Sequence, residues 1–186
     1  MKSKLGKWLF IWLLGMTAMV VLIALLFPGK HVDLKEINFK TSSSSRIYFK
    51  NMRSYFYDSE QDKASNYQLN RISTREIDDS NTFNFIIIDN WLLDEAYIML
   101  ETNLVDFPDS SIKIKYVESN EEKFIQLKEA NNEANYIFAA QLYEVISRKN
   151  QLSIYQSNKW TPFSQEELKS LKKSLEDYFK LVGKIY

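Results

Sequence analysis

The segment TFNFIIID, residues 82–89, is the part of the sequence that most directly indicates the fold. Its three consecutive isoleucines are β-branched, and such a run is typical of a strand that is covered on both faces. Residues 95–102 follow after the loop at residues 90–94, and we expect them to pair with this strand as a hairpin. The sequence therefore predicts a mostly antiparallel sheet that contains residues 82–89.

Further strands are predicted on both sides of this hairpin. Residues 112–117 alternate apolar and basic side chains, and residues 123–128 mirror them across Ser119 to Glu122, which indicates a second hairpin. The turns use Asn, Asp and Ser, whose side chains bond locally and tolerate unusual backbone angles. The other expected strands are residues 46–58, which are rich in aromatic residues, 67–73 and 151–156.

Two helices complete the expected domain. Residues 133–149 place apolar side chains on one stripe, and a second helix begins at Ser164. Ser164 and Glu167 have the spacing of a capping box, and Gly183 stands where a left-handed cap is required. The predicted fold class is α+β, with a mostly antiparallel sheet of about six or seven strands and two helices packed on one face.

An N-terminal transmembrane helix is predicted to precede this domain. Residues 8–27 form a run of 20 residues without a charged side chain. A helix of that length spans about 30 Å, the thickness of the hydrocarbon core of a bilayer. We expect this segment to contact lipid along its whole length, from Trp8 through Leu14 and Val20 to Phe27.

The charges around this segment predict its orientation. Lys2, Lys4 and Lys7 precede it, whereas charges of mixed sign follow it, so the N-terminus is expected in the cytoplasm. A cleaved signal peptide and a buried globular helix are the alternatives; the long apolar run and its poor cleavage site favour an uncleaved signal anchor. The predicted location is the bacterial inner (plasma) membrane, single-pass, with the C-terminal domain periplasmic or extracellular.

Three parts follow from this organisation. Residues 1–30 are the expected signal anchor with a short cytoplasmic N-terminus. Residues 31–45 are an expected polar tether, whose serine run has little to bury and should stay flexible. Residues 46–186 are the expected extracytoplasmic α+β domain.

Composition excludes several kinds of chemistry. The chain has no cysteine and one histidine, so thiolate metal sites, disulfides and histidine-rich metal sites are excluded. No glycine lies between Lys30 and Val182, so a glycine-rich phosphate loop cannot exist there. Lys2, Lys4, Lys7 and Lys30 are the only charged residues among the first thirty, which leaves 20 basic and 24 acidic residues, a net charge of −4, in the remainder. We therefore expect no cofactor, no metal and no nucleic acid partner.

Two alternative functions, an enzyme and a carrier of a small ligand, stay open. A carboxylate-dependent enzyme that acts on glycans needs two carboxyl groups across a groove, with an aromatic platform such as Trp91. Its candidate carboxyl groups are those of Asp78, Asp79, Asp89, Asp94 and Glu95. A carrier of a small apolar ligand or lipid needs a cavity between sheet and helices. That cavity is expected behind Ile86, Ile88, Phe138 and Leu175.

The favoured prediction is a module without a catalytic centre that binds another envelope protein, as an accessory or assembly factor. An anchor, a tether and a globular domain without a recognisable catalytic motif point to this role, because the anchor keeps the domain close to other membrane proteins. The candidate partner contacts are aromatic residues, which often anchor interfaces when exposed. They are Trp91, Trp160, Tyr55 and Tyr57.

Overall fold

The structure is a computed structural model, and it describes residues 8–10, 12–19, 32, 36–62, 65–75, 82–104, 111–148, 150–156 and 158–185. Two compact units are distinguished, residues 1–31 and residues 32–186. Each unit is described by itself.

In the first unit, residues 8–10 and 12–19 are helical, and their side chains are exposed. Trp8 and Leu14 belong to these stretches, whereas Val20 and Phe27 lie outside the described residues. No helix within the described ranges combines the length and the apolar character needed to cross a bilayer. The transmembrane helix proposed for residues 8–27 therefore gains no support from the described residues and stays a prediction.

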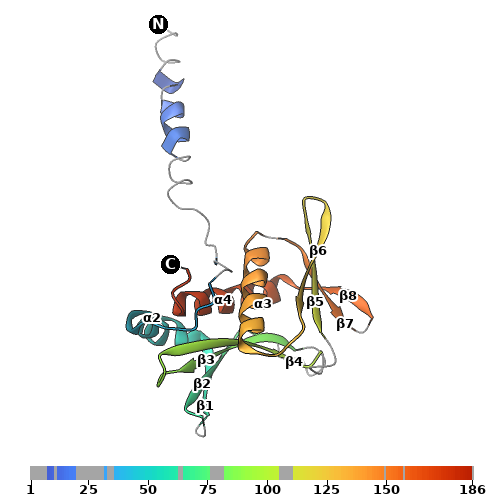
Figure 1. Cartoon of the computed structure of the whole chain (residues 1–186). Helices are drawn as coiled ribbons and strands as arrows, with labels where there is room; N and C mark the ends of the chain where they lie inside the picture. The colour runs from blue at the N-terminus through green and yellow to red at the C-terminus, as the bar shows by residue number, and fades with distance from the viewer. Residues whose placement is uncertain are drawn as a thin grey trace. The chain divides into compact units, whose positions relative to one another are not determined.

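The second unit confirms an α+β fold with antiparallel strands, but the strands form two sheets where we expected one (Figure 1). The first sheet has the order β1 (Tyr57–Asp62), β2 (Tyr67–Ile72), β3 (Phe83–Asn90), β4 (Glu95–Thr102). The second sheet has the order β6 (Glu121–Leu127), β5 (Ile112–Glu118), β7 (Leu152–Gln156), β8 (Lys159–Pro162). β8 was not predicted.

Non-local pairing explains why the predicted single sheet is wrong. The free edge of β4 is partly occupied by an earlier segment: Lys40 forms a bridge with Glu95, and the N–H of Ala96 donates to the carbonyl of Phe39 at 2.8 Å. β5 therefore does not continue the first sheet, and instead pairs with β6 on one side and β7 on the other. No local pattern in the sequence indicates that residues 39–41 occupy the free edge of β4.

Two helices join the sheets into one core. α3 (Asn132–Ser147) contacts β4 of the first sheet and β6 of the second, and it lies between the sheets in Figure 1. α4 (Gln165–Leu181) contacts α3, β3 and β4. The capping box of Ser164 and Glu167 is confirmed, and so is the left-handed conformation of Gly183, whose φ is 68°.

The segment that we expected to form a strand at residues 46–58 is helical up to Phe56, so that prediction is wrong. It consists of α2 (Ser43–Tyr48), the π-helix η1 (Phe49–Arg53) and the 3₁₀ helix η2 (Ser54–Phe56), and we call it the helical segment. Phe49 and Arg53 are four residues apart and Phe56 follows three later, which is a helical spacing. The burial of this stripe against other elements outweighs the β propensity of the aromatic residues.

The serine run is not the flexible stretch that we expected. Ser42 is the N-cap of α2, and a reciprocal capping box joins it to Ser45. The Ser45 hydroxyl also donates to the carbonyl of Leu181 at 2.7 Å, beyond the reach of a local motif. Val32, also within the expected tether, is fully buried. These contacts tie residues of the proposed tether to the folded unit.

Candidate binding cleft

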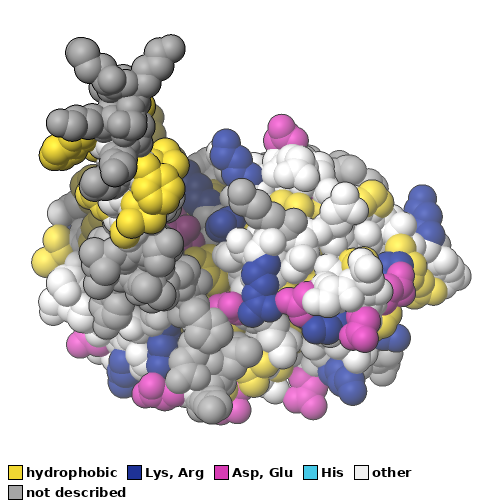
Figure 2. Space-filling view, turned by 90° about the horizontal axis from the view of Figure 1, so that it is seen from above, with side chains coloured by type: hydrophobic (Ala, Val, Ile, Leu, Met, Phe, Trp, Pro, Cys, Tyr) yellow, Lys and Arg dark blue, Asp and Glu magenta, His cyan; other side chains and the backbone are white. Residues whose placement is uncertain are grey.

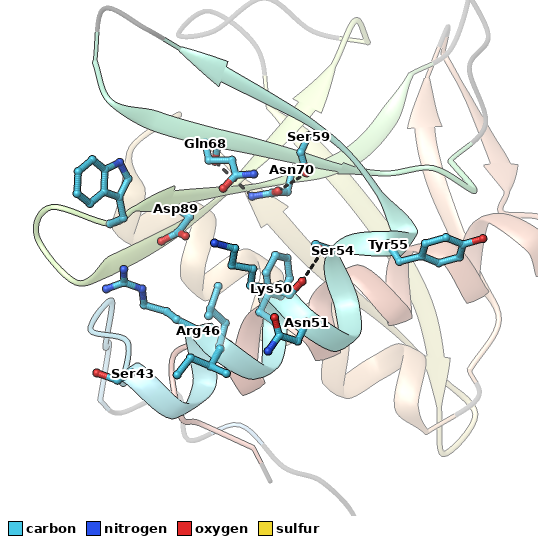
Figure 3. A pocket seen from close by; sticks show the side chains of 14 residues that line it. Ser43, Arg46, Lys50, Asn51, Ser54, Tyr55, Ser59, Gln68, Asn70 and Asp89 are labelled. Carbon is cyan, nitrogen blue, oxygen red and sulfur yellow. Dashed lines mark hydrogen bonds between the residues drawn. The ribbon is translucent and has the colours of Figure 1, made fainter.

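An open cleft of about 960 Å³ lies between the helical segment and the first sheet (Figure 3). We call its sheet side the floor and its helix side the roof. The floor consists of Ser59, Gln68, Asn70 and Asp89, from β1, β2 and β3. Trp91, in the turn between β3 and β4, also lines the cleft.

The floor residues are polar side chains on the face of the sheet that elsewhere forms the core. Along β3, Phe85, Ile87 and Asp89 share one face because side chains alternate along a strand. The first two are buried, and the third reaches the cleft. A polar residue at a core-face position is often functional. This alternation is the signal in the sequence that could have identified Asp89 as a site residue.

Asn70 organises the floor and is itself 1% exposed. Its side-chain oxygen accepts a hydrogen bond from the Ser59 hydroxyl at 2.7 Å, and its amide nitrogen donates to the carbonyl of Ile87 at 3.3 Å. The same nitrogen donates to the carbonyl of Gln68 at 3.3 Å. Because the Ser59 hydroxyl donates its hydrogen to Asn70, its lone pairs can accept hydrogen bonds from a ligand in the cleft.

Asp89 is the ionisable group of the floor. Its pKa is raised, mainly because burial disfavours the charged carboxylate. The positive charge of Arg46 acts against this rise, and the negative charge of Asp94 adds to it. Its Oδ1 atom is buried and accepts no hydrogen bond from the described residues. The carboxylate is therefore incompletely satisfied by the protein itself.

The substitution Asp89→Asn is expected to raise the free energy of unfolding at pH 7 by about 0.5–2 kcal/mol, the usual gain when a strained site is relieved. A raised pKa means that the folded protein binds the proton more tightly than the unfolded chain. The wild type therefore gains stability as the pH falls through this raised pKa towards the ordinary value of 3.8. In that pH range, the difference in free energy of unfolding between Asp89→Asn and the wild type should become smaller. Thermal unfolding at pH 7, 5 and 3.5 measures it; an Asn variant that is less stable at pH 7 contradicts this account.

The roof presents cationic and amide groups. Figure 3 shows Arg46, Lys50 and Asn51 on the helical segment, across the cleft from Gln68 and Asp89. Arg46 forms an ion pair with Asp94, whereas Lys50 forms none with another described residue. Lys50 and Asn51 belong to the π-helix η1, and π-helical turns are rare and frequent at functional sites.

A buried ion pair attaches the roof to α4. Arg53 donates two hydrogen bonds to the Asp177 carboxylate, from Nε at 2.7 Å and from Nη2 at 2.9 Å. The hydroxyl of Tyr57 donates to the same carboxylate at 2.8 Å, and Asp177 is 3% exposed. The ammonium group of Lys173 lies 3.4 Å from the ring centroid of Phe56. This clamp holds the helical segment at a set distance from the sheet.

The predicted partner contacts lie in different places. Tyr55 is 90% exposed and points away from the sheet in Figure 3, and Trp91 is half exposed on the β3–β4 turn. Trp160 lies on β8 of the second sheet, where its ring packs against Phe124 at 5.8 Å. Tyr57 is buried, with its hydroxyl on Asp177, so we no longer propose it as a contact residue.

Of the candidate carboxyl groups in the described residues, Asp94 is near enough to Asp89 for its charge to raise the pKa of Asp89, but it does not line the cleft. Asp89 is the one acidic residue that lines the cleft within the described part of the chain. Asp94 pairs with Arg46, and Glu95 pairs with Lys40 at 2.8 Å. Hydrogen bonds from Lys40 and from the Tyr97 hydroxyl lower the pKa of Glu95. The remaining candidates, Asp78 and Asp79, lie outside the described residues.

Three of the four residues expected to surround the apolar cavity of a lipid carrier are packed in the core. Leu175 and Phe138 are packed in the core and are at most 1% exposed, and Ile86 is also buried. None of these residues, nor Ile88, lines the large cleft. Phe138 borders a shallow hollow of about 220 Å³ at the surface beside β6 and α3. Within the described ranges, no group of three acidic or histidine side chains is placed to hold a metal ion.

The cleft combines a polar floor, a roof attached to α4 and exposed aromatic residues at its edge, which makes it the candidate binding site of the domain. Comparison of the chain with models of protein families, with curated proteins and with solved structures finds no match.

Proposed function

We propose that this protein is a single-pass membrane protein whose extracytoplasmic domain, without a catalytic centre, binds another envelope protein as an accessory or assembly factor. The observation that carries the proposal is the exposed apolar surface on both sides of the cleft. On the roof side, Ile47, Met52 and Tyr55 are each at least 60% exposed. On the turn between β3 and β4, Trp91, Leu92 and Leu93 are each at least 50% exposed.

Such a surface is unusual for a module that has no partner. Single exposed apolar residues are common, but several on two adjacent elements form a patch of the kind that marks an interaction site. Aromatic residues in such patches frequently supply much of the binding energy.

Charge distribution supports a protein partner over nucleic acid. Figure 2 shows basic and acidic side chains interspersed over one face of the molecule, without a broad region of one sign. Nucleic acid binding relies on a concentrated basic surface. The described ion pairs, such as that of Lys184 with Glu36 at 3.0 Å, further neutralise individual cations.

A role without catalysis is supported by the set of groups in the cleft. Hydrolysis of a glycosidic bond by the usual mechanism needs two carboxyl groups on opposite sides of the bond. Among the described lining residues, Asp89 supplies one carboxyl group and no second one faces it. This distribution favours binding over hydrolysis.

Membrane attachment through residues 8–27 is part of the proposal and rests on the uncharged run in the sequence. Protease protection in spheroplasts tests it. We expect the domain from residue 46 onward to be digested from outside while the cells remain intact. A reporter fused after Tyr186 that proves cytosolic contradicts this topology.

Site-specific photo-cross-linking in native membranes tests the partner surface. A photoreactive residue at Tyr55 and one at Leu92 should capture the same envelope protein, identified by mass spectrometry, because both are exposed apolar positions on the two elements that flank the cleft. The control position is Phe124, which is 58% exposed on the second sheet. Equal capture from all three positions, or different proteins from Tyr55 and Leu92, contradicts the proposed surface.

A further inference from the structure

The floor of the cleft carries recognition groups that contact with an apolar protein surface does not use. We propose that it binds a neutral saccharide, with Asp89 accepting a hydrogen bond from a sugar hydroxyl and Trp91 covering an apolar face of the sugar ring. This site goes beyond the protein-binding role and does not depend on it.

The first argument is the set of unused hydrogen-bonding groups. Oδ1 of Asp89 is buried without a donor, and the side-chain amides of Gln68 and Asn51 form no hydrogen bond with another described residue. The Ser59 hydroxyl donates to Asn70, so its lone pairs can also accept a hydrogen bond from a ligand. Donors and acceptors therefore converge on one hollow, and a ligand with many hydroxyl groups, each both donor and acceptor, matches them.

The second argument is charge. Arg46 is already paired with Asp94, and the remaining charges of the lining are one cation, Lys50, and one anion, Asp89. A phosphate or carboxylate ligand meets the repulsion of Asp89, and a cationic ligand meets that of Lys50 and Arg46. A neutral ligand avoids both costs, while Asp89 still gives it a charge-assisted hydrogen bond.

The third argument separates a saccharide from an extended peptide. Peptides that add to a sheet pair with the main chain of an open edge strand. The cleft floor is instead a sheet face, where β2 is paired with both β1 and β3 from Gln68 to Arg71. This face offers side chains to a ligand, and side-chain amides and carboxylates suit the hydroxyl groups of a sugar.

The fourth argument is shape. The cleft of about 960 Å³ is at the upper end of the range for ligand pockets and is open on one side, as a short oligosaccharide requires. Trp91 lines it and is 50% exposed, so part of its side chain is accessible to a ligand. The electron-rich face of an aromatic ring attracts the C–H groups on the apolar face of a pyranose.

The test is binding of three neutral trisaccharides, N,N′,N″-triacetylchitotriose, cellotriose and maltotriose, to the full chain in lipid nanodiscs. Ligand-observed NMR and isothermal titration calorimetry measure the dissociation constants. We expect at least one trisaccharide to bind in the micromolar to millimolar range. Asp89→Asn and Trp91→Ala should each weaken that binding by at least about tenfold, the size expected for loss of a hydrogen bond to a charged group or of an aromatic contact.

Matched controls separate recognition from folding. Tyr155→Ala removes an exposed aromatic residue of the second sheet and should leave saccharide binding unchanged. Asp89→Asn is expected to be more stable than the wild type, so a loss of binding in that variant cannot arise from unfolding.

Two results overturn the saccharide site. One is that none of the three trisaccharides binds at millimolar concentration; the other is that one binds with an affinity that Asp89→Asn and Trp91→Ala leave unchanged. Neither result affects the cross-links from Tyr55 and Leu92, so failure of this site and failure of the protein-binding role are distinguishable.

Discussion

Arg53→Ala is expected to lower the free energy of unfolding by about 3–5 kcal/mol, the cost of breaking a buried ion pair by removing one partner. The substitution removes both guanidinium hydrogen bonds to Asp177 and leaves that carboxylate, 3% exposed, with the Tyr57 hydroxyl as its remaining donor among the described residues. An unpaired charge in this position is costly because water cannot reach it. Urea unfolding of the full chain, followed by circular dichroism, measures the effect.

The matched control is Arg75→Ala. Arg75 pairs with Asp58 at 2.5 Å, and the Asp58 side chain is 61% exposed, so the carboxylate that Arg75→Ala leaves behind remains in contact with water. Exposed ion pairs contribute at most about 1 kcal/mol. If Arg53→Ala costs no more than Arg75→Ala, Asp177 does not clamp the helical segment, and the roof of the cleft is held by apolar contacts alone.

Phe138→Ala is expected to cost about 3–5 kcal/mol, because it removes a large side chain from a closely packed core and leaves a cavity. Phe138 is 1% exposed on α3, and its ring centroid lies 6.5 Å from that of Phe83 and 6.3 Å from that of Phe85. The control is Phe124→Ala, which removes the same side chain from an exposed position and should cost about 1 kcal/mol or less. Equal losses in the two variants contradict the packing described for α3.

Phe138→Ala also tests whether the two sheets unfold together. α3 contacts β4 of the first sheet and β6 of the second, so damage to it should destabilise both. Trp91 reports on the first sheet and Trp160 on the second, and each can be followed after the other three tryptophans of the chain, Trp8 and Trp12 included, are changed to Phe. Coincident urea midpoints are expected for a single cooperative unit; two separated midpoints show that the sheets unfold independently.

Hairpins and helix ends were predictable because their determinants are close together in the chain. The β5–β6 hairpin turns at Ser119 and Asn120, both with positive φ, as the turn residues suggested. The capping box of Ser164 and Glu167 needs only residues three apart. These interactions form within one or two turns of chain, so residue type and spacing are sufficient to identify them.

The cleft was only partly predictable. Asp89 and Trp91 were candidates because they flank a loop, yet the face of Asp89 could have been read from the alternation along β3. Lys50 and Asn51 were missed because their segment was expected to be a strand, and its aromatic richness hid the helical spacing of Phe49, Arg53 and Phe56. Asp177 was missed because its partner Arg53 is 124 residues away in the chain.

By itself, the sequence determined the α+β class, the antiparallel hairpins, the start and end of α4, and the absence of thiolate and glycine-loop chemistry. These properties depend on composition or on neighbours within a few residues. Only the tertiary structure decided that the strands divide into two sheets, that residues 43–56 are helical, and that a polar cleft lies beneath them. Each of these depends on contacts between distant segments, such as Lys40 with Glu95 and Arg53 with Asp177, whose burial free energy outweighs local propensity.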